Sequence, residues 1–113
     1  DKLAHYISYM AAEVGFPVEA KQGVYSSDST PFADKSVPAL SFARLASSNV
    51  APIHCRYDLM EVMSMEQLQR DIDFLVKFTE RFANAAVCPV AREIPEKIKK
   101  ELDEYLARKR KEQ

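Results

Sequence analysis

The stretch from Ser64 to Phe82 constrains the fold of this chain most, because it carries the strongest helix signal in the sequence. Ser64 and Gln67 have the spacing of a capping box, in which two side chains satisfy amides that a first helical turn leaves unpaired. Leu68, Ile72, Leu75 and Phe82 mark the core stripe of this helix at helical spacing, and Phe74 and Phe78 widen its apolar face. We therefore predict a helix that lies between a sheet and another element of the fold, rather than on an open surface.

Apolar residues also recur at helical spacing near both ends of the chain. At the start, one helix face is formed by Leu3, Ile7, Met10 and Val14. Gly15 then supplies a typical helix stop. Near the end, Pro95 suits the first turn of a helix, whose narrow apolar stripe is Ile98, Leu102, Tyr105 and Leu106. The sequence thus predicts a first helix over residues 1–14 and a last helix that begins at Pro95.

Two other segments have the patterns of β-strands. In residues 16–21, Phe16, Val18 and Ala20 alternate with more polar positions, as in a half-buried strand. The run 37–43 is nearly all apolar, as in a strand buried on both faces of a parallel sheet. Between them lies a loop rich in Ser, Asp, Thr and Pro, with one helical turn expected at 31–35. The predicted fold class is therefore α/β, a layer with two parallel strands flanked by three helices.

The predicted sheet has too few strands to be stable by itself. Its edge should either pair with another copy of the chain or join a larger sheet, because an unpaired strand edge is a template for further pairing. We therefore expect the isolated chain to self-associate.

Charge and composition exclude several classes of function. The 113-residue chain fits one domain, and its formal net charge of -1 gives no field that would attract nucleic acid or an anionic membrane. No apolar run is long enough to cross a bilayer, and no targeting segment is visible, which favours a cytoplasmic location for the chain as given. The only glycines, Gly15 and Gly23, form no phosphate-binding loop, and Cys55 and Cys88 suggest no disulfide framework.

His54 is the residue best placed to carry chemistry. It follows apolar Ile53 in a loop, and Asp58 lies four residues further on. A neutral imidazole can bind a metal through one nitrogen while a carboxylate orients the other. A histidine with a nearby aspartate is also common in purely structural hydrogen bonding, so Asp58 could equally hold the loop. The other histidine, His5, falls within the first predicted helix and reads as an ordinary helix residue.

Four ordered motifs resemble the C-terminal third of the co-catalytic zinc aminopeptidases, in the clan that includes the glutaminyl cyclases. The motifs are Ser-Asp-x-x-Pro-Phe-Ala from Ser27, Val-Pro-Ala-Leu from Val37, Ile-His-x-x-x-Asp from Ile53, and the capped helix from Ser64. They span residues 25–82. The resemblance implies a partial phosphorylase/hydrolase-like layer, with residues 1–113 as a single C-terminal fragment of a larger peptidase catalytic domain.

The resemblance also implies roles for individual residues. His54 matches the last zinc ligand, Asp28 a buried aspartate of the loop lining the active site, and Asp58 the acid that follows the ligand. Tyr25 lies near a position where some relatives place a phenol that steadies an oxyanion. Many relatives have His at the position of Ser29 and Thr at the positions of Cys55 and Leu59, differences that bear on substrate preference and activity.

The function implied is that of a hydrolase, a metallopeptidase that removes N-terminal residues from peptides. In such enzymes two zinc ions activate water and a glutamate carries its proton. The present chain should be inactive alone, since the remaining ligands and the general base are expected upstream of Asp1. The alternative is a small non-catalytic α/β interaction domain that self-associates through its strand edge, in which His54 and Asp58 form only a structural hydrogen bond.

Overall fold

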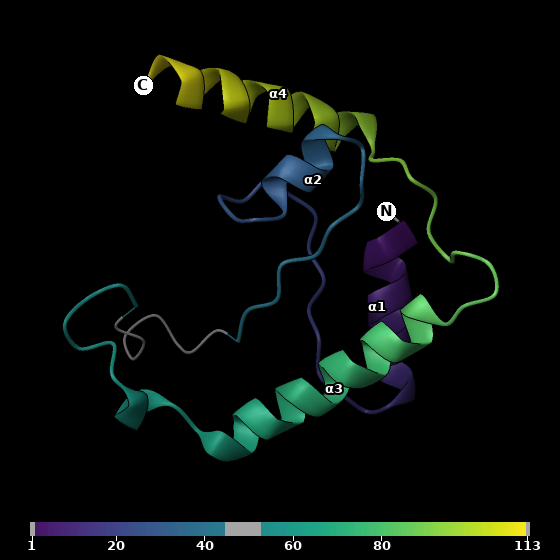
Figure 1. Ribbon diagram of the computed structural model, residues 1–113, viewed down its shortest axis with the longest axis vertical. Coiled ribbons are helices and arrows are strands. Elements are labelled where there is room, and N and C mark those ends of the chain that lie inside the picture. Colours follow the sequence, from purple (N-terminus) through teal and green to yellow (C-terminus); the bar gives the residue numbers. More distant parts are fainter. Residues whose placement is uncertain (1, 45–52, 113) are drawn as a thin grey trace.

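The computed structural model describes residues 2–44 and 53–112. Its helices are α1 (Lys2–Glu13), α2 (Thr30–Asp34), the 3-10 helix η1 (Met60–Val62), α3 (Met65–Ala83) and α4 (Glu96–Lys111). Helix α1 packs against α3, and α2 packs against α4 (Figure 1). Helices α4 and α3 lie at opposite ends of an open, flat molecule, with α1 and α2 between them, and the principal extents are 43 × 39 × 19 Å.

The predicted α/β fold is wrong, because the described residues form no strand. The two expected strands, 16–21 and 37–43, run as irregular chain. Their backbone hydrogen bonds to other described residues are those of their first amides, from Phe16 to the Ala11 carbonyl at 2.8 Å and from Val37 to the Phe32 carbonyl at 3.0 Å. A strand is defined by a ladder of bonds to a neighbour, and the described residues supply no such neighbour.

Burial nevertheless follows the alternation that suggested the first strand. Phe16, Val18 and Ala20 are half-buried and pack against the hydrophobic core, whereas the residues between them are exposed. The alternating pattern therefore reported which side chains face the core. It did not report backbone pairing, because an extended segment laid across helices gives the same pattern of burial.

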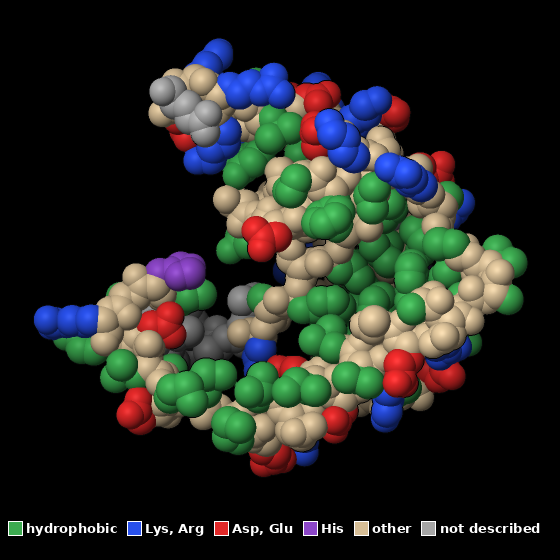
Figure 2. Space-filling model, in the orientation of Figure 1, with side chains coloured by type: hydrophobic (Ala, Val, Ile, Leu, Met, Phe, Trp, Pro, Cys, Tyr) green, Lys and Arg blue, Asp and Glu red, His purple; other side chains and the backbone are tan. Residues whose placement is uncertain are grey.

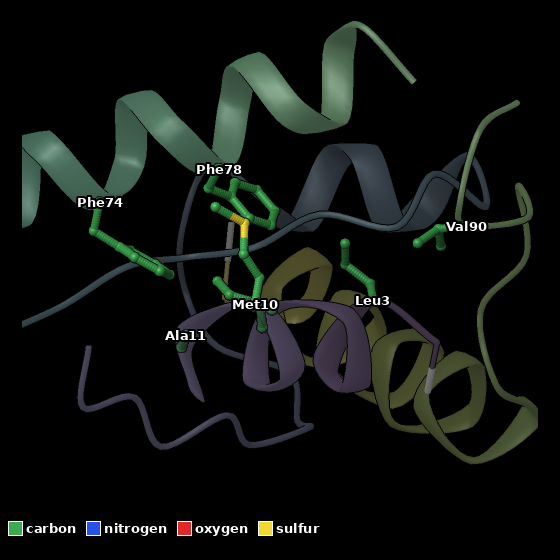
Figure 3. Close-up of a cluster of buried hydrophobic side chains, with 7 residues drawn as sticks. Leu3, Met10, Ala11, Phe74, Phe78 and Val90 are labelled. Atoms are coloured by element: carbon green, nitrogen blue, oxygen red, sulfur yellow. The ribbon is translucent and has the colours of Figure 1, made fainter. Parts of the chain in front are cut away.

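The core joins α1 to α3 (Figure 3). Its buried members are Leu3, Ile7, Met10 and Ala11 from α1, Phe74 and Phe78 from α3, and Val90 from the connection to α4. The Phe16 ring stacks on Phe74 with centroids 4.3 Å apart, and Tyr6 meets Phe82 edge to face at 5.5 Å. These aromatic contacts hold the irregular segment 16–21 and α1 on one side of α3.

The helix positions are largely confirmed, but the core stripe expected on α3 is not: Phe74 and Phe78 are buried, whereas Ile72 is exposed. The Ser64 hydroxyl accepts a hydrogen bond from the Gln67 amide at 3.3 Å and caps α3, which is one half of the predicted capping box; the described residues show no reciprocal bond from the Gln67 side chain. Helix α1 ends at Glu13, and Gly15 follows with a left-handed φ of 68°, a conformation that glycine adopts without strain. Pro95 was expected in the first turn of the last helix. It lies at the N-cap instead, and α4 begins one residue later, at Glu96. Val14 was expected in the first helix stripe, but it lies beyond α1 and is exposed.

None of the helices in the described part of the chain has the length and apolar character needed to span a membrane.

Candidate metal-binding histidine

His54 lies in a tight turn between residues 53 and 58. Its φ of 59° is in the left-handed region, which histidine visits more readily than β-branched residues do. The Asp58 amide donates to the Cys55 carbonyl at 3.0 Å, and the His54 amide donates to Asp58 Oδ2, also at 3.0 Å. These two bonds close the turn, so the backbone at His54 is fixed by its own neighbours.

Asp58 therefore holds the loop rather than the imidazole. Of the two roles considered from the sequence, orienting a ring nitrogen or holding the loop, the geometry corresponds to the second. A carboxylate that accepts a backbone N–H satisfies a donor that would otherwise be left to solvent. The same hydrogen bond ties the His54 amide to the other end of the turn. It therefore restrains the left-handed backbone conformation of His54.

The His54 side chain is exposed, and among the described residues it has no hydrogen-bond or ion-pair partner. Within that part of the chain, no group of three or more His, Cys, Asp or Glu side chains is arranged to hold a metal ion. A zinc ion in a protein takes about four ligands. The described residues thus fit the role of donating one imidazole to a zinc site, and they do not fit a complete site.

Tyr25 and Asp28 lie in the loop that leads into α2, and both side chains are exposed. The burial of Asp28 that the family resemblance implies is not seen in this structure. No hydrogen bond or ion pair between described residues joins either side chain to His54 or Asp58. In Figure 1 this loop and the turn at 53–58 lie on separate parts of the molecule. The structure does not bring the four predicted site residues together.

Three serine hydroxyls organise the loop around Tyr25 and Asp28, a cluster that the sequence reasoning missed. Ser27 Oγ lies 2.6 Å from Ser29 Oγ and 2.9 Å from Ser41 Oγ, and Ser41 Oγ donates to Ser29 Oγ at 3.1 Å. The Thr30 hydroxyl also donates to the Tyr25 carbonyl at 2.9 Å. Because Ser41 is distant in sequence, the cluster ties this loop to the irregular segment 37–43. The only feature of the sequence that indicated this serine cluster was the high content of small polar residues in the loop.

An ion pair fixes Arg44, the residue directly after the irregular segment 37–43, on α3. Arg44 Nε donates to Asp71 Oδ2 at 2.7 Å, and a second guanidinium nitrogen donates to Asp71 Oδ1, so the pair is bidentate. The hydrogen bond from Arg44 holds the pKa of the Asp71 carboxyl below its usual range. Segment 37–44 is thus held by a serine cluster at Ser41 and by this pair at Arg44.

A mostly apolar hollow of about 460 Å³ opens beside the core. Its lining includes Leu40 and Phe42 from the irregular segment 37–43 and Phe78 and Phe82 from α3. The Cys88 thiol, also on the lining, donates to the Val90 carbonyl at 3.0 Å. The hollow lies against segment 37–44 rather than at His54.

Comparison with known proteins gives no relative: no family model, no curated protein and no solved structure matches this chain.

Proposed function

We propose that this chain is the C-terminal portion of a zinc metallo-aminopeptidase, that it contributes His54 as one zinc ligand, and that it is inactive alone. The observation that carries the proposal is the presentation of His54: an exposed imidazole without a partner among the described residues, on a turn whose backbone is fixed by Asp58. The order of the motifs between residues 25 and 82 is the sequence support for it.

A fixed backbone matters for a metal ligand, because an imidazole must approach the ion along its lone pair. The Asp58 carboxylate accepts a hydrogen bond from the His54 amide. This bond restrains the backbone at His54 and so limits the directions in which the imidazole can point. In this proposal Asp58 supports the ligand through the backbone, a role usually filled by a carboxylate bonded to the ring itself. When bound, zinc would polarise the scissile carbonyl and lower the pKa of a bound water.

Tyr25 and Asp28 belong to the same proposal as residues of the loop that borders the substrate. Both are exposed on a loop that the serine cluster organises, so both are accessible to a peptide. The family resemblance assigns to Tyr25 a phenol near the oxyanion of the reacting peptide and to Asp28 the ordering of the site, but both lie apart from His54 in this structure and do not support the proposal. These roles require the remainder of the enzyme, since one imidazole cannot hold a zinc ion for catalysis.

The test is aminopeptidase activity of the longer protein that contains this sequence, assayed with aminoacyl substrates as His54→Ala and as the matched control His5→Ala. His5 is exposed on α1, which makes it a histidine with the same chemistry in an unrelated place. We expect His54→Ala to lose activity by more than about 100-fold, the upper end of the losses seen for residues that merely support a ligand. His5→Ala should keep full activity. Equal activity of the two variants would overturn the proposal.

The alternative of a small α/β interaction domain that self-associates through its strand edge is contradicted by the structure. It relied on a strand edge, and the described residues contain no strand.

A further inference from the structure

Helix α3 carries apolar side chains on two sides. Phe74 and Phe78 point into the core, while Met65, Ile72 and Val76 are exposed to 68%, 43% and 48%. At about 100° per residue, these last three lie within roughly 40° of one another and almost opposite the core stripe. Half-buried Leu68 and Leu75 fall between the two stripes. The apolar arc is thus about 200° wide, twice what one packed face needs.

The segment before α3 extends this exposed surface. Met60, Val62 and Met63 are exposed to 75%, 56% and 50%, and they lead directly into Met65. We name Met60, Val62, Met63, Met65, Ile72 and Val76 the outer apolar surface. Figure 2 shows hydrophobic side chains gathered along α3 and over the segment that precedes it, open to solvent on this face. Side chains of this kind are normally buried in a folded protein.

The whole molecule has more surface than a compact monomer should have. Its accessible area is 9270 Å², whereas a compact monomer of 12.8 kDa exposes about 6,300 Å². Its radius of gyration is 16.3 Å, against about 13 Å for a compact domain of this length. The excess is therefore about 3,000 Å². Obligate homodimers bury about 2,000–5,000 Å² in total, half from each chain, so the excess is enough for one side of such an interface.

The charged residues of α3 indicate which kind of partner the outer apolar surface can bind. The charged side of α3 alternates acids and bases: Glu66, Arg70, Asp73, Lys77, Glu80 and Arg81. The first two already pair at 3.0 Å. A helix that binds an anionic membrane has a polar face rich in Lys and Arg instead. With a net charge of -1, two copies of this chain repel each other very little. The apolar surfaces of two copies can therefore come into contact with little electrostatic repulsion between the chains.

We propose that two copies of this chain associate through the outer apolar surface, with Ile72 and Val76 at the centre of the contact. This inference does not rest on the proposed peptidase function, in which the remainder of the catalytic domain would compete with a second copy for the same surface. It also replaces the strand edge, from which self-association was first expected, with a helix face.

The test is sedimentation equilibrium of the chain over a wide range of micromolar concentrations. The expected mass is twice the 12.8 kDa of one chain. Ile72→Glu and, as an independent variant, Val76→Glu should each weaken association by about 10- to 100-fold, as expected for a charge at the centre of an interface. Both positions are exposed in the single chain, so helix content by circular dichroism should not change.

The matched control is Ser8→Glu, which adds the same charge at an exposed position of α1, outside the outer apolar surface. It should associate like the unmodified chain. A single-chain mass at every concentration would overturn the proposal, and vesicle binding by that monomer would assign the surface to a membrane. Unchanged association of both glutamate variants would overturn it as well.

Discussion

The backbone amide of His54 donates to Asp58 Oδ2 at 3.0 Å, so a carboxylate four residues along the chain fixes the conformation of the candidate metal ligand. His54 has a left-handed φ of 59°, which a non-glycine residue keeps only where its surroundings hold it. The stability of this turn is the link between the local sequence and the proposed role of His54.

Removing the acceptor should open the turn. In Asp58→Ala the His54 amide loses its hydrogen bond, and its hydrogen exchange, measured by NMR, should become faster. Asp58→Asn keeps an acceptor oxygen and should exchange more slowly than the alanine variant. If the His54 amide exchanges equally fast in the unmodified chain and in Asp58→Ala, this hydrogen bond does not hold the turn.

Phe74 should be among the most important residues for stability. It is 3% exposed and stacks on Phe16, so Phe74→Ala would leave a cavity and should lower the free energy of unfolding by about 3–5 kcal/mol. Urea denaturation measures this difference. Lys77→Ala, at an exposed position of the same helix, should change it by less than about 0.5 kcal/mol. Similar losses for the two variants would contradict the core described here.

The two glycines should respond differently to the same substitution. Gly15 has a left-handed φ, so Gly15→Ala should cost about 1–2 kcal/mol even though no atom lies within 4 Å of an added Cβ. Gly23 has equal space and no positive φ, so Gly23→Ala should be neutral or stabilise the fold by less than about 1 kcal/mol. Thermal unfolding of both variants tests the helix stop after α1. If Gly23→Ala lowered the unfolding temperature more than Gly15→Ala, the stop of helix α1 would not be at Gly15.

The Arg44–Asp71 pair should make stability depend on acid pH. Arg44 lowers the pKa of Asp71 in the folded chain, so the pair stabilises the fold above the ordinary aspartate pKa. That contribution is lost as pH falls through the lowered pKa. Asp71→Asn should therefore unfold at a lower temperature than the unmodified chain at neutral pH, and the difference should shrink toward pH 2.

Asp103 is the control for this pH dependence. It is exposed on α4 and makes no ion pair with other described residues, so Asp103→Asn should leave the pH profile of thermal unfolding unchanged. A difference between Asp71→Asn and the unmodified chain that stays constant across this pH range would contradict the assigned role of the ion pair.

The helices could be predicted from the sequence because their signals are local. The capping serine at Ser64 and the stop at Gly15 act within a few residues of where they lie, and both are found in the structure. The strands could not be predicted reliably in the same way. Alternation at Phe16, Val18 and Ala20 encodes burial on one side, and a ladder also needs a partner that the local sequence does not specify.

The candidate site was predictable only in part. The spacing of His54 and Asp58 indicated that the two residues interact, and they do, but the bonded atom is the backbone amide rather than the imidazole. The serine cluster joins Ser27 and Ser29 to Ser41, across a separation at which short-range patterns carry no information. The Arg44–Asp71 pair joins residues further apart still, from two segments that meet only in the folded chain.

The most direct test of the central claim is zinc binding by calorimetry to the longer protein that contains this sequence, compared with its His54→Ala and His5→Ala variants. If His54 is a zinc ligand, His54→Ala should weaken zinc binding by more than about 100-fold, beyond the loss expected for a supporting residue, and His5→Ala should bind like the unmodified protein. Unchanged zinc affinity in His54→Ala would show that the exposed imidazole is not a ligand and would contradict the proposed function.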